Sequence, residues 1–394
     1  MHYNPTLPEV RANLYAHYAY LRDHAPVYWV ESLQAWAVSR HDDVTYILKN
    51  PHLFSSSAFF DRLLGEFNPV PEIPWMITSD PPAHTRLRKL ANKGFMPSMI
   101  RNLTPRIGAI TLELIERLRV QREFDFTRDF SAVFPVLVIA EMLGVERERR
   151  ADFKRWADDI ISAANRATAS EEDHQRIRQS VRDVREYFEE TIAHRRQAPG
   201  DDIISAFVRA EEENQALTST EVLSLSILLL LGGSETTTNL LGSLMVTLLE
   251  QLDDLARVRR DPSLIPQLVE EGLRYHSPVQ ALFRQTTQTV EIAGTSIPAH
   301  TTVMPLLASA NRDPRKFPDP ARFDLTRNTD GHVAFGLGVH FCLGAPLARA
   351  EARVALEALL PYLPSLKTTA QPATWLDSFF VRGPKTLPLA LIEV

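Results

Sequence analysis

The sequence predicts a mainly α-helical protein with a small β region. Across residues 104–260, charged helical faces alternate with apolar stripes, and residues 222–250 read as one long apolar helix. Short segments rich in β-branched and aromatic residues are confined to the neighbourhoods of 26–40 and 279–305. Because the 394 residues contain no fixed-period repeat, low-complexity tract or clear linker, we expect a single domain over 1–394.

The first elements follow from local signals. Residues 26–38 read VYWV, a short turn and AWAV, which predicts a β-hairpin. The Asp80-Pro81-Pro82 segment predicts a helix start, because the N–H groups of a first turn have no intrahelical partner, and this helix should run towards Phe95. More helices follow, with breaks at Pro199-Gly200 and near Asn214.

After Pro278 the pattern changes to short strands and loops. The β-like pieces at 289–292 and 301–304 are separated by Gly and Pro, which interrupt regular structure. The last helix predicted runs over 345–360. Outside the two β-richer segments we expect helices and loops only.

Composition excludes several classes of function. The formal net charge is -6 and the basic residues are scattered, so no nucleic-acid partner is expected. The longest strongly apolar run, 222–233, is too short to cross a bilayer, and residues 1–8 lack the layout of a secretory signal. We therefore expect a cytoplasmic protein with no membrane partner. Its one cysteine, Cys342, excludes an internal disulfide and a multi-cysteine metal site.

Cys342 lies in a glycine-rich loop, FGLGVHFCLG over 335–344, just before the last predicted helix. Peptide N–H groups at a helix start favour negative charge and therefore a thiolate, which is the form that binds metals. The glycines permit positive φ and a close approach of the backbone to a flat ligand. Taken alone, such a cysteine is more often a small buried hydrophobe. A dinucleotide-binding turn does not fit, because the third glycine is misplaced and no βαβ pattern precedes it.

The ten-residue segment resembles the haem-binding signature of the cytochrome P-450 family, aromatic-Gly-x-Gly-x-basic-x-Cys-x-Gly, with every fixed position filled. The resemblance implies the cytochrome P-450 fold, with haem b between the long distal helix and the proximal helix after the cysteine loop. It makes Cys342 the axial ligand of the haem iron, places Phe335 against the haem as a shield for the sulfur, and includes Gly344 in the cofactor-binding loop. His340 would hydrogen-bond a haem propionate.

The resemblance also assigns Glu271 and Arg274. Three residues apart on a helix, they lie on one face and can pair, although most such pairs are solvated and contribute little. In the family, this Glu-x-x-Arg pair is buried and structural. An arginine from the downstream segment Ala321-Arg322-Phe323 is expected to join it.

The long apolar helix carries an unusual run, Gly232-Gly233-Ser234-Glu235-Thr236-Thr237. Adjacent glycines weaken a helix, and hydroxyls can bond back to its carbonyls, so we expect a local opening or bend there. By resemblance this is the distal oxygen-binding groove, with Thr236 as the hydrogen-bonding catalytic residue and Glu235 as the proton relay. The alternative is a small-residue face that lets another helix pack closely.

Three further cations are assigned to the haem propionates by resemblance. His84 and Arg88 lie four residues apart on the helix after Asp80, so both can reach one anion, and Arg284 lies in a β-like segment after Pro278. Without a haem, each would be read as a surface charge.

The family layout also suggests a largely apolar substrate pocket. Its candidate lining residues, which could equally be ordinary core, are Phe59, Phe60, Leu229, Gly233, Val279, Leu282, Phe283 and Phe379.

The resemblance implies a haem-thiolate monooxygenase that hydroxylates or epoxidises an apolar small molecule. The family's habits point to a molecule of secondary metabolism. It would consume dioxygen, and electrons from NAD(P)H would reach it through a ferredoxin reductase and a ferredoxin. A monomer is expected. The hypothetical docking face for the ferredoxin consists of Arg86, Lys89, Lys93, Arg349 and Arg353. The alternatives are a peroxide-driven peroxygenase, a non-catalytic haem-binding protein, and a hydrolase that uses Cys342 with His340.

Overall fold

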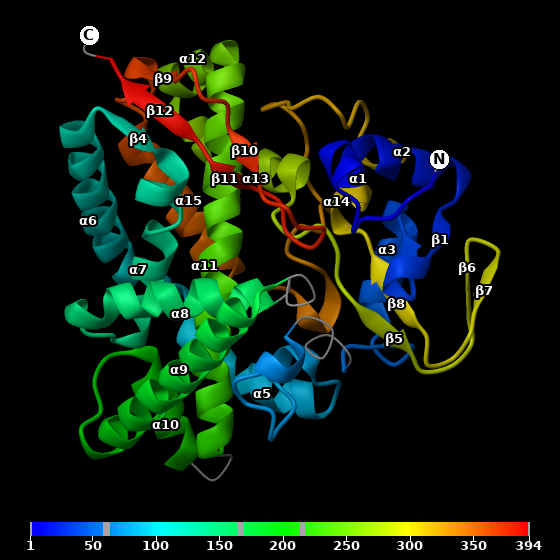
Figure 1. The fold of residues 1–394 in the computed structure, drawn as a ribbon, viewed down its shortest axis with the longest axis horizontal. Coiled ribbons are helices and arrows are strands. Elements are labelled where there is room, and N and C mark those ends of the chain that lie inside the picture. Colours follow the sequence, from blue (N-terminus) through cyan, green and yellow to red (C-terminus); the bar gives the residue numbers. More distant parts are fainter. Residues whose placement is uncertain (1, 58–63, 164–168, 213–216, 393–394) are drawn as a thin grey trace. The chain divides into compact units, whose positions relative to one another are not determined.

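A computed structural model describes residues 2–57, 64–163, 169–212 and 217–392 of the chain (Figure 1). The chain divides into two compact units. Unit 1 comprises Met1–Ser55, Thr111–Ser131 and Thr236–Val394, and unit 2 comprises Ser56–Ile110 and Ala132–Glu235. Two of the boundaries fall inside helices, namely α6 (Pro97–Gln121) and α11 (Ser219–Glu250).

Unit 1 combines helices with all of the strands that the structure describes. Its helices besides the shared ones are α1 (Pro8–Ala12), α2 (Leu14–His24), α3 (His41–Lys49), α12 (Leu252–Arg260), α13 (Ile265–His276), α14 (Leu307–Ala310) and α15 (Ala345–Leu359). Its strands are β1 (Val27–Val30), β2 (Ala35–Val38), β3 (Phe54–Ser55), β4 (Glu123–Asp125), β5 (Arg284–Thr286), β6 (Val290–Ile292), β7 (Thr295–Ile297), β8 (Thr302–Pro305), β9 (Leu366–Thr368), β10 (Thr374–Trp375), β11 (Pro384–Thr386) and β12 (Pro388–Leu391).

The predicted hairpin forms one edge of a five-stranded sheet with strand order β1-β2-β8-β5-β3. Strands β1 and β2 pair antiparallel, and Gln34 takes a left-handed conformation (φ 48°) in the turn between them. Strand β8 pairs parallel to β2 and antiparallel to β5, which carries Arg284. Aliphatic side chains from these strands and from α3 form a buried core cluster. Val333 belongs to this cluster and Leu337 packs against it, so the sheet supports the segment that leads to Cys342.

The C-terminal strands correct the prediction that the rest of the chain is helical. Strand β12 pairs antiparallel with both β4 and β9, and β10 pairs with β11. Each of these strands has two to four residues, and β11 and β12 both begin with proline, so none produces a recognisable alternating pattern. Pairing between segments that are distant in sequence forms these sheets.

Unit 2 consists of helices and loops, and its described residues contain no strand. Besides the shared helices it contains α5 (Ala83–Ala91), α7 (Phe134–Leu143), α8 (Arg150–Ser162), α9 (Glu171–Gln197) and α10 (Ile203–Glu212). Helix α9 begins with a capping box, in which Ser170 and Asp173 satisfy each other's backbone N–H groups. The predicted break at Pro199-Gly200 separates α9 from α10. The helix predicted after Asp80 is α5, followed by a 3-10 turn that ends at Phe95.

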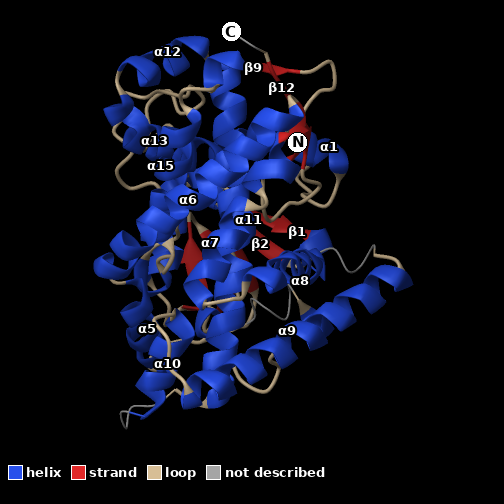
Figure 2. Ribbon diagram, turned by 90° about the vertical axis from the view of Figure 1, so that its left-hand side faces the viewer, coloured by secondary structure: helices blue, strands red, loops and turns tan. Residues whose placement is uncertain are grey.

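Helices dominate the ribbon, and the strands are short (Figure 2). Helix α11 is the longest helix of the structure. It runs without interruption from Ser219 to Glu250, so the opening expected at Gly232-Gly233 does not break the helix. The helix keeps its backbone hydrogen bonds through the glycines and threonines. Within the described residues, none of the helices combines the length and the apolar character that crossing a membrane requires.

Candidate active site

The cysteine loop closes on itself before α15 begins. The Cys342 N–H group donates to the Phe335 carbonyl oxygen (2.9 Å). The residues between them in the chain include a 3-10 turn over Gly338–His340. Gly344 is the N-cap of α15, and a Cβ atom placed on it would lie 4.0 Å from the Cys342 Sγ atom. The sulfur therefore lies beside the start of a helix, where the peptide dipoles favour an anion. Cys342 is half-buried.

Two glycines of the loop have left-handed backbones. Gly336 has φ +69° and Gly338 has φ +74°, a region that side chains rarely adopt. A Cβ atom on Gly338 would also lie 2.6 Å from the Leu48 carbonyl oxygen at the end of α3. The loop can therefore pack against α3 only because position 338 has no side chain.

Gly338→Ala is expected to lower the free energy of unfolding by about 1–3 kcal/mol, because it adds backbone strain and a clash with an immovable carbonyl. The control is Gly108→Ala in α6, where an added Cβ meets nothing within 4 Å and should raise stability by up to ~1 kcal/mol. Urea unfolding of both variants checks the pair. Equal effects would contradict the role given to Gly338.

The residues of unit 1 fit a haem. Within the described part of the chain, no group of three or more His, Cys, Asp or Glu side chains can hold a metal ion. A haem iron takes most of its ligands from the porphyrin, so one cysteine sulfur is the kind of ligand that the protein has to add. Arg284 is a buried cation in β5, with its Nη1 atom donating to the Phe283 carbonyl oxygen (2.7 Å), and a buried cation suits a propionate.

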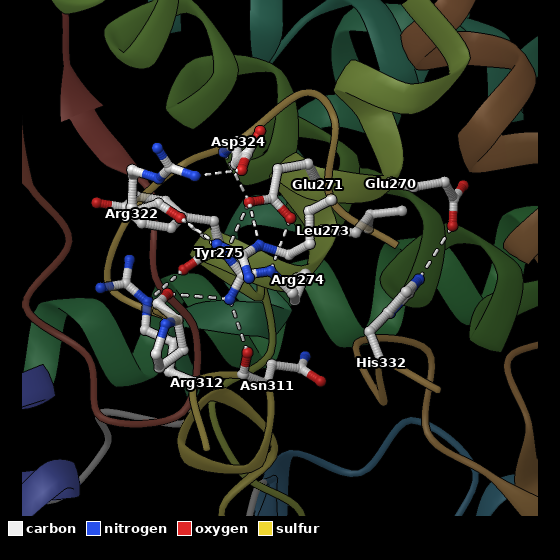
Figure 3. A network of polar contacts seen from close by, with 12 residues as sticks. Glu270, Glu271, Leu273, Arg274, Tyr275, Asn311, Arg312, Arg322, Asp324 and His332 are labelled. Atoms are coloured by element: carbon white, nitrogen blue, oxygen red, sulfur yellow. Dashed lines mark hydrogen bonds and ion pairs between the residues drawn. The ribbon is translucent and has the colours of Figure 1, made fainter. Parts of the chain in front are cut away.

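The Glu271–Arg274 pair is buried in α13, as predicted. Both side chains are fully buried, and two parallel hydrogen bonds of 2.7 Å join the guanidinium to the carboxylate (Figure 3). Arg274 Nη1 also donates to the carbonyl oxygens of Asn311 (2.9 Å) and Pro320 (3.0 Å). The pair thus fastens α13 to the long loop that leads to Cys342.

A different arginine from the one predicted joins this pair. Arg327 Nε lies 3.2 Å from Glu271 Oε1, whereas the Arg322 side chain binds Asp324 (2.6 Å) at the surface. Arg322 contributes its backbone carbonyl, which accepts from Arg274 Nη2 (3.3 Å). The prediction for the Ala321-Arg322-Phe323 segment was therefore wrong about the side chain. The loop turns Arg322 outward and Arg327 inward.

The two glycines of α11 in unit 2 serve different purposes. A Cβ atom on Gly233 would lie 2.6 Å from Ile139 Cδ1, so this glycine allows α7 to pack closely, as the alternative interpretation holds. Gly232 has no such neighbour and is exposed. Burial, together with the nearby Asp158 carboxylate, raises the pKa of Glu235 to about 7. Glu235 can therefore release and take up a proton near neutral pH.

A buried acid that the sequence reading missed contacts the threonine run in unit 1. Glu351 of α15 is buried and hydrogen-bonded to the side chain of Thr237, the residue after Thr236. Burial raises the pKa of Glu351 well above its usual range, because a buried site disfavours the charged form of a carboxyl group. The available signal was an acidic residue on the apolar face of a helix that begins next to Cys342.

His84 and Arg88 lie on the helix that was predicted to follow Asp80. His84 is buried in α5, and Arg88 is half-buried one turn later, with its Nε atom donating to Asn92 Oδ1 (3.0 Å). Three members of the predicted docking face already have acidic partners. Arg86 is bound to Glu221 and Arg349 to Glu270, and Arg353 lies 3.9 Å from Glu357.

The predicted pocket residues are only partly brought together. Phe59 and Phe60 lie outside the described residues. Leu229 is buried in α11 of unit 2. In unit 1, the rings of Phe283 and Phe379 meet edge to face, with 6.4 Å between their centres. Val279 and Leu282 pack against the core cluster under the sheet, so for these two the ordinary-core alternative holds at least in part.

Comparison with known protein families and solved structures agrees with the resemblance found in the sequence. The cytochrome P450 family model matches residues 7–365. Cytochrome P450 107B1 of Saccharopolyspora erythraea is 40% identical over 91% of this chain and 90% of its own length, and 6-deoxyerythronolide B hydroxylase of that organism is 38% identical over 96% of each. The structure of cytochrome P450 CYP109Q5 from Chondromyces apiculatus superimposes with a TM-score of 0.90 at 43% identity, covering 100% of this chain and 98% of that one. The chain therefore belongs to the cytochrome P450 family and is a haem-dependent monooxygenase.

Proposed function

We propose that Cys342 is the axial thiolate ligand of haem b and that the chain works as one cytochrome P450 domain. The observation that carries the proposal is the closed loop in which the Cys342 N–H group bonds to the Phe335 carbonyl and the sulfur lies beside the N-cap of α15. His340, Gly344 and Phe335 complete this loop as cofactor-binding residues. The propionate-binding set is His84, Arg88, Arg284 and His340.

The bound haem supplies the activation of dioxygen and the oxidising power. The residues of the chain supply position and protons. The Thr236 hydroxyl acts as a hydrogen-bond donor on the oxygen side, and Glu235 takes up protons from outside and passes them, through water, towards Thr236. A carboxyl with a pKa of about 7 suits this relay because it exchanges its proton readily at neutral pH.

Product formation is expected to fall as the pH rises through about 7, because Glu235 loses the proton that it donates. Asp158 raises the pKa of Glu235, so Asp158→Asn should move this falling limb to lower pH. Glu235→Gln should lower the rate by about 10²-fold or more and remove the limb, by the usual size of acid–base catalysis. Steady-state rates of product formation between pH 5.5 and 9 test these expectations. If Asp158→Asn did not move the pH at which the rate falls, the role of Glu235 as proton relay would be contradicted.

The substrate is proposed to be a largely apolar small molecule of secondary metabolism, which is hydroxylated or epoxidised. One relative is named as a hydroxylase of 6-deoxyerythronolide B, and Phe283 and Phe379 offer aromatic rings in unit 1. Electrons are proposed to come from NAD(P)H through a ferredoxin reductase and a ferredoxin, to a monomer in the cytoplasm. Because Arg86, Arg349 and Arg353 all pair with acidic side chains, the docking hypothesis now rests on Lys89 and Lys93.

Two assays test the proposed function. Candidate ligands are screened for the optical shift that accompanies loss of iron-bound water, and positive ligands are incubated with ferredoxin, reductase and NADPH. Oxygen insertion into a ligand with this electron supply, and not with peroxide alone, supports the proposal. Equal turnover with peroxide alone would favour a peroxygenase, and binding without turnover in either assay would favour a haem-binding protein.

A further inference from the structure

Glu270 precedes the buried Glu271 in α13 but belongs to a second cluster. Figure 3 shows Glu270 and His332 apart from the Glu271–Arg274 network. Arg349 of α15 holds Glu270 through two bonds, Nε to Oε1 (2.5 Å) and Nη2 to Oε2 (2.9 Å). Burial alone would raise the pKa of Glu270, but the bonds from Arg349 and His332 outweigh it and lower the pKa to about 2. Glu270 and Arg349 therefore form a stable ion pair at neutral pH.

His332 fixes the other side of the carboxylate. Its Nδ1 atom accepts the Ala334 N–H group (3.3 Å), which leaves Nε2 as the ring donor, 3.0 Å from Glu270 Oε2. His332 and Ala334 belong to the segment that leads directly to Phe335. The carboxylate is thus tied both to α15, which follows the cysteine loop, and to the chain that enters the loop.

The cluster reaches Cys342 through one aromatic ring. The guanidinium carbon of Arg349 lies over the Phe335 ring, 4.6 Å from its centre, which is within the range of a cation–π contact. The carbonyl of the same Phe335 accepts the Cys342 N–H group. Phe335 therefore contacts the Arg349 charge through its ring and Cys342, the proposed iron ligand, through its carbonyl oxygen.

This geometry differs from that of an ordinary surface pair on the same helix. Arg353 and Glu357 of α15 lie 3.9 Å apart, and both side chains are about half exposed. The Arg349 pair has a two-bond planar fork, a third partner and an aromatic platform, all of which restrict the position of the charge. Arg353 thus provides a matched control for the loss of one charge from α15.

We infer that Glu270 and Arg349 are positioning residues that set the electrostatic potential at Cys342 and so the ease with which the haem iron takes up an electron. This inference rests on the proposed ligation of iron by Cys342. A nearby cation stabilises the electron-rich reduced state, and the Glu270 carboxylate offsets that effect. Groups around a metal ligand tune reduction potential in this way.

The experiment measures the midpoint potential of the substrate-free holoprotein for Glu270→Gln, Arg349→Gln, the double variant and Arg353→Gln. Glu270→Gln should favour reduction and Arg349→Gln should oppose it, each by roughly three- to tenfold in the equilibrium constant, where tenfold is about 59 mV for one electron. The double variant should return towards the unmodified protein. Arg353→Gln should change the constant by less than about twofold, because salt screens an exposed charge.

The spectrum of the reduced, carbon monoxide-treated protein distinguishes failure of the proposed function from failure of this inference. If the unmodified protein lacks the thiolate band, the proposed function fails. If the band is present but Arg349→Gln shifts the potential no more than Arg353→Gln does, or in the same direction as Glu270→Gln, the inference is overturned. Should Arg349→Gln not bind haem, the sign of the shift in Glu270→Gln decides, because that change removes charge with almost no change in volume.

Discussion

Replacing Arg274 with methionine is expected to lower the free energy of unfolding by about 3–5 kcal/mol, the usual result of leaving one partner of a buried ion pair uncompensated. Glu271 is fully buried and would lose its two-bond partner, with Arg327 left as a single-bond contact at 3.2 Å. The carbonyl oxygens of Asn311 and Pro320 would also lose their donors. Urea unfolding followed by circular dichroism measures the change.

Helix α12, which precedes α13, provides a matched control. Arg257 and Asp254 of α12 are also three residues apart and 3.0 Å from each other, but the arginine is 38% exposed. Arg257→Met is expected to cost less than about 1 kcal/mol, as surface pairs do. Equal losses for the two variants would show that burial of the α13 pair has no special weight.

Replacing Cys342 with serine is expected to abolish oxygen insertion, because an alkoxide is not formed at neutral pH and the thiolate's donation to iron is lost. The protein should still fold, since Cys342 is half-buried and serine has nearly the same shape. The unfolding free energy of the haem-free protein should change by less than about 1 kcal/mol, a typical value for a mild substitution. Turnover with the ferredoxin system and thermal unfolding are measured on the same samples. Retained turnover would contradict the ligand assignment.

The elements predicted correctly are those whose pattern is local. The hairpin β1–β2 follows from two apolar quartets around a turn, and α11 follows from a long apolar run. The strands β9 to β12 were missed because each is too short to show a period, and their partners are distant in sequence. Strand β12 finds one partner near residue 124 and another near residue 367. Local sequence carries no information on such pairings.

The same distinction holds for the site. Glu271 and Arg274 are three apart on one helix, so spacing allows them to pair, but their burial as a structural pair was expected only from the family resemblance. The third member could not, because Arg322 and Arg327 lie in one irregular loop and only its path decides which side chain points inward. The Glu270–Arg349 pair joins residues that are 79 positions apart, and Arg349 alone looks like a surface cation.

The glycine pair of α11 shows a limit of propensity arguments. Two weak helix formers in sequence predicted an opening, but α11 stays continuous because it is held along its length by packing. Gly233 is explained by the approach of Ile139 from α7, which no local signal reveals. At Gly232, by contrast, an added Cβ atom would meet nothing within 4 Å, so close packing does not explain this glycine.

The most direct test of the central claim is the absorption spectrum of the purified, haem-replete protein after reduction with dithionite and addition of carbon monoxide. With Cys342 bound to iron as a thiolate, the Soret band should move to the long wavelength that distinguishes thiolate from nitrogen ligation, and Cys342→Ser should lack this band. A haem-replete protein whose band stays at the shorter wavelength would contradict the account.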